Sequence, residues 1–204
     1  MISSKEDYRY YLEADKIALS VKGSWTDYVF NHVWKFEKYL RKVEYYQNCK
    51  KSFFWKPYIY FIKWRFDRLS FKMGFLIPPN VFGPGLSIPH YGTLLVNSGA
   101  QIGANCRIHN LVGIATKAGY TEKSAKIGNN VYIGVGVVII GDVEIADNIV
   151  IGANAVVNKS FLEPGITIAG VPAKKISDKS SEGLLIRATE ILDKTLIEKK
   201  IKSR

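Results

Sequence analysis

A branched aliphatic residue returns at every sixth position through the middle of the chain. The series comprises Ile127, Ile133, Ile139, Ile145, Ile151 and Val157, and the same phase upstream gives Ile102, Ile108 and Ile114. A helix repeats at about 3.6 residues and a strand at about 2, so neither element explains a period of six. A chain that turns a corner after each short strand does explain it. Three such hexads close one coil of a parallel β-helix.

The hexads extend upstream with one irregularity and contain one insertion. Ile88 and Leu94 are six residues apart and are followed by a step of eight to Ile102. We therefore expect Ile88, Leu94 and Ile102 to begin three successive hexads, with Ile108 beginning the coil above Ile88. The longer gap between Ile114 and Ile127 predicts a polar loop over residues 115–126, and loops on rigid scaffolds often have functional roles.

Composition and cysteine use indicate a soluble, reducing, cytoplasmic protein. The chain has 204 residues with 47% hydrophobic and 23% charged residues, which is ordinary for a globular protein. The first residues lack the apolar run of a secretory signal, and no stretch approaches the ~18 apolar residues of a membrane span. Cys49 and Cys106 are too few for a disulfide framework or a four-ligand zinc site.

Charge and patterning divide the chain into three parts. Residues 1–75 contain most of the net charge of +11 and have apolar residues at helical spacing, so they predict a basic, aromatic helical region. Residues 76–176 contain the hexads. Residues 177–204 predict an amphipathic helical tail that packs on a neighbouring element or stays partly exposed.

The segment 52–73 mixes aromatic and basic residues, and Pro57 suits a helix start. The aromatic residues singled out are Trp55, Tyr58, Phe61, Trp64 and Phe66, and the basic ones are Lys56, Lys63, Arg65, Arg68 and Lys72. This composition is typical of a helix lying at a membrane surface. The alternative is a face that packs against the β-helix or another subunit. Nucleic-acid binding has no recognised motif in its favour.

The repeat and the closing motif "AGVPAKKI" (residues 169–176) resemble those of a known family. Residues 81–176 resemble the left-handed β-helix acyltransferases with hexapeptide repeats, and are most similar to serine acetyltransferases and the O-acetyltransferases of bacterial surface polysaccharides. The resemblance implies a homotrimer, with acetyl-CoA lying in a groove between neighbouring β-helices. The closing motif is typical of members that use acetyl-CoA.

Two of the three histidines lie beside the repeat without occupying its inward positions. His90 is two residues past Ile88, and His109 is one past Ile108. We expect their side chains one rung apart on one face, whereas His32, in an aromatic helical stretch, is expected to be structural. Acetyl transfer to a hydroxyl needs a base, and histidine titrates near neutral pH. By resemblance, His90 in "IPHYGT" matches the family's catalytic histidine. His109 is a second catalytic candidate because of its position in the repeat beside His90.

The remaining site residues follow from the resemblance and from polarity. Candidates to orient His90 are His109, Asn97, Asn110 or a backbone carbonyl, and backbone N–H groups of the coils are the expected oxyanion donors. The residues expected to bind the acceptor are Tyr91, Asn97 and Asn110. The residues expected to contact acetyl-CoA are Gly134, Val135, Gly152, Ala153, Asn158, Lys159 and Lys174.

Three positions depart from the serine acetyltransferase pattern. The family has acidic residues where this chain has Pro89 and Leu76, and a histidine where it has Ser124. We therefore predict an acetyl-CoA-dependent O-acetyltransferase that acts on a sugar hydroxyl in surface polysaccharide synthesis. The alternatives are a serine O-acetyltransferase and a non-catalytic β-helix scaffold, and an amine acceptor on an amino sugar stays open. No metal is expected, because the histidine triad of β-helix carbonic anhydrases is missing.

Overall fold

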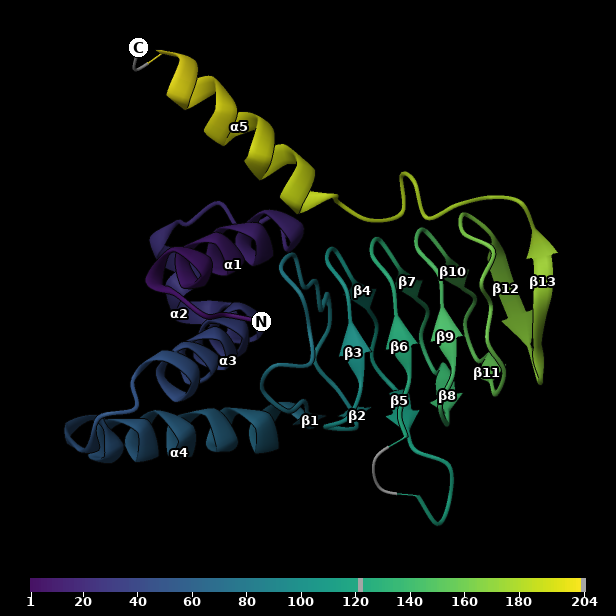
Figure 1. The fold of residues 1–204 in the computed structure, drawn as a ribbon, viewed down its shortest axis with the longest axis horizontal. Coiled ribbons are helices and arrows are strands. Elements are labelled where there is room, and N and C mark those ends of the chain that lie inside the picture. The colour runs from purple at the N-terminus through teal and green to yellow at the C-terminus, as the bar shows by residue number, and fades with distance from the viewer. Residues whose placement is uncertain (121–122, 203–204) are drawn as a thin grey trace.

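The computed structural model describes residues 1–120 and 123–202. Helices form the N-terminal part, and short strands stack into coils that extend away from them (Figure 1). The chain then runs back along the coils and ends in a helix beside the first one. The predicted fold class, a left-handed parallel β-helix with an N-terminal helical region and a C-terminal helix, is confirmed.

The strands form three sheets, which are the three sides of the coil. One sheet has the order β1-β2-β5-β8-β11, the second β13-β12-β10-β7-β4, and the third β3-β6-β9. All described strand pairs are parallel except β12 with β13. The bounds are β1 Phe75–Leu76, β2 Leu94–Val96, β3 Gln101–Ile102, β4 Arg107–Ile108, β5 Val112–Ala115, β6 Lys126–Ile127, β7 Tyr132–Ile133, β8 Val138–Ile140, β9 Glu144–Ile145, β10 Val150–Ile151, β11 Val156–Val157, β12 Thr167–Gly170 and β13 Ala173–Ser177.

The hexad residues stack in register inside the coil. Ile108, Ile133, Ile151 and Ile168 form one such column. All four are fully buried, as the inward phase predicts. Each fully buried Ile stabilises the fold by about 1.5–3 kcal/mol through apolar area removed from water, so the repeated residue is the main source of the core.

The predicted register of one upstream hexad is wrong. Val96, and not Leu94, pairs with Ile114, while Leu94 pairs with Val112. The step of eight therefore falls between Ile88 and Val96 instead of between Leu94 and Ile102. Both Leu94 and Val96 are buried, so their apolar character did not distinguish them.

Four helices precede the coils: α1 (Lys5–Ala18), α2 (Trp25–Phe30), α3 (His32–Cys49) and α4 (Lys56–Met73), with the short 3-10 helix η1 (Phe53–Trp55) before α4. α2 and α3 are separated at Asn31, because its backbone is extended and its side chain accepts the N–H of Trp34, which caps α3. Pro57 lies in the first turn of α4, as predicted.

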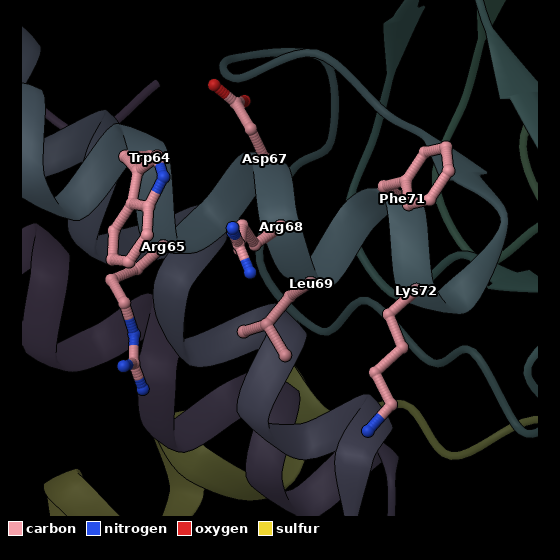
Figure 2. Close-up of a pocket in the computed structure, with 7 residues that line it drawn as sticks. All are labelled: Trp64, Arg65, Asp67, Arg68, Leu69, Phe71 and Lys72. Atoms are coloured by element: carbon pink, nitrogen blue, oxygen red, sulfur yellow. The ribbon is translucent and has the colours of Figure 1, made fainter.

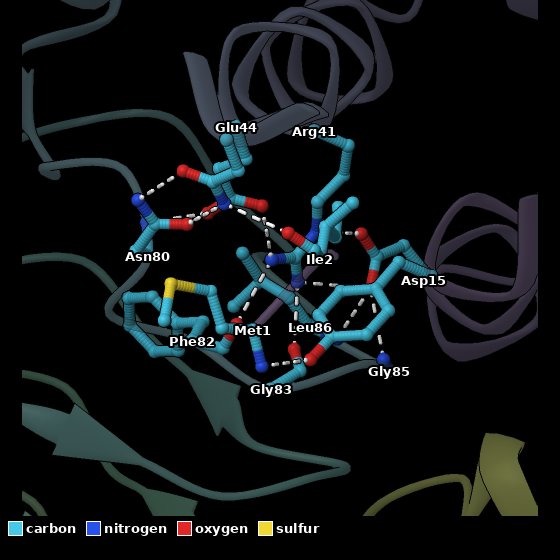
Figure 3. A network of polar contacts seen from close by, with 12 residues as sticks. Met1, Ile2, Asp15, Arg41, Glu44, Asn80, Phe82, Gly83, Gly85 and Leu86 are labelled. Carbon is cyan, nitrogen blue, oxygen red and sulfur yellow. Dashed lines mark hydrogen bonds and ion pairs between the residues drawn. The ribbon is translucent and has the colours of Figure 1, made fainter. Parts of the chain in front are cut away.

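A buried ion cluster joins the helices to the first coil (Figure 3). The guanidinium of Arg41 on α3 donates to Asp15 on α1, with Nε 2.6 Å from Oδ2, and to Glu44 at 3.0 Å. It also donates to the carbonyls of Phe82 and Gly83. Asp15 in turn accepts the N–H groups of Gly85 and Leu86. The cluster therefore fixes α1 and α3 against the coil that precedes His90.

The C-terminal segment is held along one corner of the coils. Asn105, Asn130 and Asn148, all with positive φ, form a hydrogen-bonded ladder between successive coils. Ser181, Arg187 and Thr189 bond to this ladder from the C-terminal segment. The segment leads into α5 (Ala188–Lys202), which is the C-terminal helix that the sequence predicts. α5 packs on α1 of the same chain through Ala188 and Leu192.

Candidate active site

His90 protrudes because its coil is longer than the coil above it. Ser87 pairs with Arg107, twenty positions on, whereas Leu94 pairs with Val112, only eighteen positions on. The lower coil therefore has two extra residues between these points, and they bulge outward. His90 and Tyr91 are both exposed in this bulge. Gly92 follows with φ of 132° and contacts the side chain of Asn110, where a Cβ would lie 3.3 Å from Asn110 Cβ.

The bulge places His90 beside His109, one rung above. The two ring centroids are 6.0 Å apart, and His109 also lies 5.1 Å from the ring of Tyr132. His109 is half-buried, and its Nε2 is buried with no hydrogen-bond partner in the described part of the chain. The structure thus places the two predicted catalytic histidines side by side where the bulge meets the next coil.

Burial lowers the pKa of His109, and the charges of Arg107 and His90 lower it further. The imidazole of His109 is therefore neutral at neutral pH. It can accept or donate a hydrogen bond beside His90 without adding a fixed charge.

We expect the NMR chemical shifts of the His109 ring protons to follow a pH titration whose midpoint lies below the ordinary histidine pKa of about 6.5. Substituting Arg107→Gln should move the midpoint upward, because it removes a neighbouring positive charge. Because the unfolded chain binds this proton more readily, the contribution to stability is present above about pH 6.5 and is lost as the pH falls. A midpoint above the ordinary value would contradict this assignment.

Small residues continue the same corner of the coil beyond the histidines. We call the corner formed by His90, His109, Gly134, Gly152 and Ala169 the histidine edge. His109, Gly134, Gly152 and Ala169 each directly follow an inward isoleucine of one sheet, one coil after another, and His90 lies two residues past Ile88 in the bulge. A Cβ on Gly134 would lie 2.8 Å from Ala153 N, so glycine is required there by close stacking. From His109 to Ala169 the edge spans three rungs, or roughly 14 Å.

An exposed lysine lies at the far end of the histidine edge, and exposed small or apolar side chains lie along its middle. Lys174 on β13 pairs with Ala169 and is exposed. Val135 and Ala153 are exposed beside Gly134 and Gly152. A thin apolar chain ending in an anionic group fits such an edge, because the small residues allow close approach and Lys174 supplies the positive charge.

Other predicted residues lie at a different corner of the same chain. We call the corner formed by Asn97, the loop 115–126, Asn158 and Lys159 the loop edge, because each follows the sheet that contains β2, β5 and β11. The side chain of Asn97 accepts the N–H of Gly99. Asn158 and Lys159 are exposed, and Lys159 Nζ lies 5.4 Å from the ring centroid of Phe161. Within one chain, Asn97 and His90 thus lie at different corners of the coil. Residues 121–122 of the loop lie outside the described residues.

The structure adds two points about the site. Backbone N–H groups of the coils are the expected oxyanion donors, and those of Gly134 and Gly152 already donate to the carbonyls of Ile151 and Ile168 in the ladder. Tyr132 and Arg107 were missed as neighbours of His109. Each directly precedes an inward isoleucine, and strand alternation predicts an outward side chain there.

The positions that depart from the serine acetyltransferase pattern are dispersed. Pro89 adjoins His90 in the bulge, and Leu76 on β1 is exposed in the strand next to Leu95. Ser124 is buried near the end of the loop, and its Oγ has no hydrogen-bond partner among the described residues. In the described part of the chain, no cluster of three or more His, Cys, Asp or Glu could hold a metal ion.

Comparison with known proteins gives both a family model and relatives. The model for bacterial transferase hexapeptide (six repeats) matches residues 124–159. Serine acetyltransferase of Helicobacter pylori (strain J99) is 33% identical over 125 residues, which cover 60% of this chain and 72% of that protein. Serine acetyltransferase of Buchnera aphidicola subsp. Schizaphis graminum is 31% identical over 101 residues, and the chain spans only 38% of its length. The match covers 48% of this chain.

One relative that matches over a short stretch has a name that specifies a different acceptor, a galactoside. Galactoside O-acetyltransferase of Escherichia coli (strain K12) is 50% identical over 52 residues, or 26% of this chain and 25% of that protein.

Solved structures have the same architecture. Serine acetyltransferase of Neisseria gonorrhoeae superposes with a TM-score of 0.68 at 25% identity, covering 85% of this chain and 68% of that one. Serine acetyltransferase of Brucella abortus in complex with coenzyme A gives 0.66 at 23% identity, covering 86% and 68%, which shows the shared fold alone. With the repeat, the stacked coils and the H. pylori relative together, the chain belongs to the hexapeptide-repeat transferase family, and serine acetyltransferases are among its relatives.

Proposed function

We propose that the chain is an acetyl-CoA-dependent O-acetyltransferase with His90 as its general base. The pairing of His90 with His109 at one end of the small-residue histidine edge is the observation that supports this most. The family membership and a related structure with coenzyme A bound support acetyl-CoA as the co-substrate.

The proposed reaction needs one proton to move twice. His90 takes the proton from the acceptor hydroxyl as the oxygen attacks the thioester carbonyl. When the carbon–sulfur bond breaks, the imidazolium returns that proton to the departing thiolate. Acetyl-CoA supplies the activated acyl group, and general-base help of this kind accounts for about 10²–10⁴ in rate.

The histidine edge and the loop edge complement each other between copies of the chain. The histidine edge has the base and the small residues, whereas the loop edge has Asn158 and Lys159 and leads into the loop. A homotrimer would place the loop edge of one copy against the histidine edge of the next. This arrangement, which the family resemblance implies, accounts for predicted site residues that lie apart in one chain.

Serine is the first candidate acceptor, which reverses the order expected from sequence. Two serine acetyltransferases of Helicobacter pylori are each 33% identical to this chain, which covers 72% of their length. A sugar hydroxyl is the second candidate, favoured by the short match to a galactoside O-acetyltransferase and by the departures at Pro89, Ser124 and Leu76. A role in surface polysaccharide synthesis and a cytoplasmic location stay predictions.

The acceptor is tested by measuring free CoA released from acetyl-CoA with L-serine and with a panel of sugars that includes galactosides and amino sugars. We expect a serine-dependent rate above that for any sugar, with the acetyl group on oxygen by mass spectrometry. A faster rate with a sugar would replace serine by that acceptor. Absence of both turnover and acetyl-CoA binding would favour the scaffold alternative and contradict the enzyme.

A further inference from the structure

The short helix η1 and the outer side of α4 expose several aromatic side chains. We call the residues Phe53, Phe54, Tyr60, Phe61, Trp64 and Phe71 the aromatic face. Phe71 is 92% exposed, Phe54 89% and Tyr60 71%. A soluble protein rarely exposes several large aromatic residues together without a partner, because each costs apolar area in water.

The aromatic face comprises exposed residues of η1 and the side of α4 that the fold leaves unpacked. The opposite side contributes Ile62, Phe66 and Met73 to the core, and Phe66 stacks on Phe36 of α3 with centroids 5.3 Å apart. Figure 1 shows α4 along the outer edge of the helical region, with α3 on one side only. The sequence pattern groups the aromatic residues of segment 52–73 together, but the fold separates them, because Phe66 is buried and Trp64 is exposed.

Cations flank the aromatic face on both sides. At about 100° per residue, Arg65 and Lys72 lie on one flank and Lys56 and Lys63 on the other. Arg68 lies between Trp64 and Phe61, with its guanidinium 5.1 Å from the ring centroid of Trp64. Figure 2 shows Trp64, Asp67 and Phe71 on one side of the helix, with Arg65 and Lys72 extending from it in another direction. Among the described residues, none of these five cations forms an ion pair with a carboxylate.

We propose that α4 binds an anionic lipid surface through the aromatic face. Aromatic rings favour the boundary between headgroups and acyl chains, and unpaired Lys and Arg beside them are attracted to anionic headgroups. No described helix is long and apolar enough to cross a membrane, so α4 would lie in the plane of the surface.

Charge favours lipid over a second copy of the chain on this face. A two-fold contact between aromatic faces would bring two sets of five cations together, with only Asp67 on each helix to offset them. An anionic lipid surface supplies the missing negative charge, and it adapts to side chains of unequal length.

The test is flotation of the purified full-length chain with vesicles of phosphatidylcholine alone or mixed with phosphatidylglycerol. We expect binding only to the anionic vesicles at low salt, and weaker binding as salt rises, because screening shortens the reach of the charges. Each Lys or Arg near the surface is worth about fivefold in partitioning, so the double variant R65Q/R68Q should bind about 25-fold more weakly.

Matched variants separate the aromatic face from general charge and hydrophobicity. W64S/F71S should lose vesicle binding, whereas L162S/L184S, which alters exposed leucines elsewhere, should bind like the wild type. K126Q/K179Q removes the same net charge as R65Q/R68Q and should bind more tightly than that variant. Circular dichroism verifies that each variant is folded.

Several outcomes would overturn the proposal. These are no binding to anionic vesicles at low salt, equal loss in the control variants, or self-association that W64S/F71S abolishes while vesicles stay unbound. Preference for a single-stranded oligonucleotide over anionic vesicles would assign the face to nucleic acid. Acetyl transfer to a small acceptor in solution should be unchanged in W64S/F71S, so this test is independent of the proposed activity.

Discussion

Replacing His90 with alanine is expected to lower acetyl transfer by about 10²–10⁴-fold, because the acceptor hydroxyl then has no base at the bulge. The bulge protrudes from the coil and His90 is exposed, so its removal should leave the core and the thermal midpoint unchanged. The measurement is the rate of CoA release at saturating acetyl-CoA. His32→Ala is the matched control, since His32 is an exposed histidine at the start of α3, and it should retain full activity.

Near-normal turnover in a folded His90→Ala variant would refute the general-base role. His90→Asn gives a second measure, because asparagine keeps a hydrogen-bonding side chain but cannot take a proton at neutral pH. Equal losses in both variants indicate proton transfer, whereas activity restored by asparagine would indicate that His90 only positions the acceptor.

Replacing Asp15 with alanine is expected to lower the free energy of unfolding by about 3–5 kcal/mol. The change leaves the guanidinium of Arg41 with its main partner gone, and the side chains of both residues are fully buried (Figure 3). It also leaves the N–H groups of Gly85 and Leu86 without their acceptor. Urea denaturation monitored by circular dichroism measures the loss.

The exposed Arg187–Glu190 pair provides the control for the ion cluster. Its N–O distance is 3.4 Å, and both side chains are in contact with solvent. Glu190→Gln should cost less than about 1 kcal/mol, because water already screens the pair. If Asp15→Ala costs no more than Glu190→Gln, the cluster does not hold the helices to the coil.

The period of six predicted the coil because a branched aliphatic residue occupies every sixth position from Ile127 to Val157, a spacing that no helix or single strand produces. The same signal failed at Leu94 and Val96, since both are apolar and both become buried. The sequence shows that extra residues are present, but hydrogen bonding between coils decides where they bulge. That choice is what exposes His90.

Contacts between distant parts of the chain could not be read from local patterns. Asp15, Arg41 and Glu44 look like surface residues of amphipathic helices, and they are buried only because the first coil supplies Phe82 and Gly83 carbonyls to Arg41. The separation of the histidine edge from the loop edge depends on which side of the coil each hexad occupies. The resemblance named residues from both edges without this information.

We propose that CoA binds along the histidine edge next to His90, and calorimetric titration of CoA into the purified chain tests this central proposal most directly. The wild type should bind CoA, and Val135→Glu should weaken binding at least about tenfold, because an exposed carboxylate on the edge repels phosphates and obstructs the arm. Leu162→Glu, away from the edge, should bind like the wild type, with equal oligomeric state verified by sedimentation. Equal affinity in all three proteins, or no binding by the wild type, would contradict the assignment of this edge to acetyl-CoA.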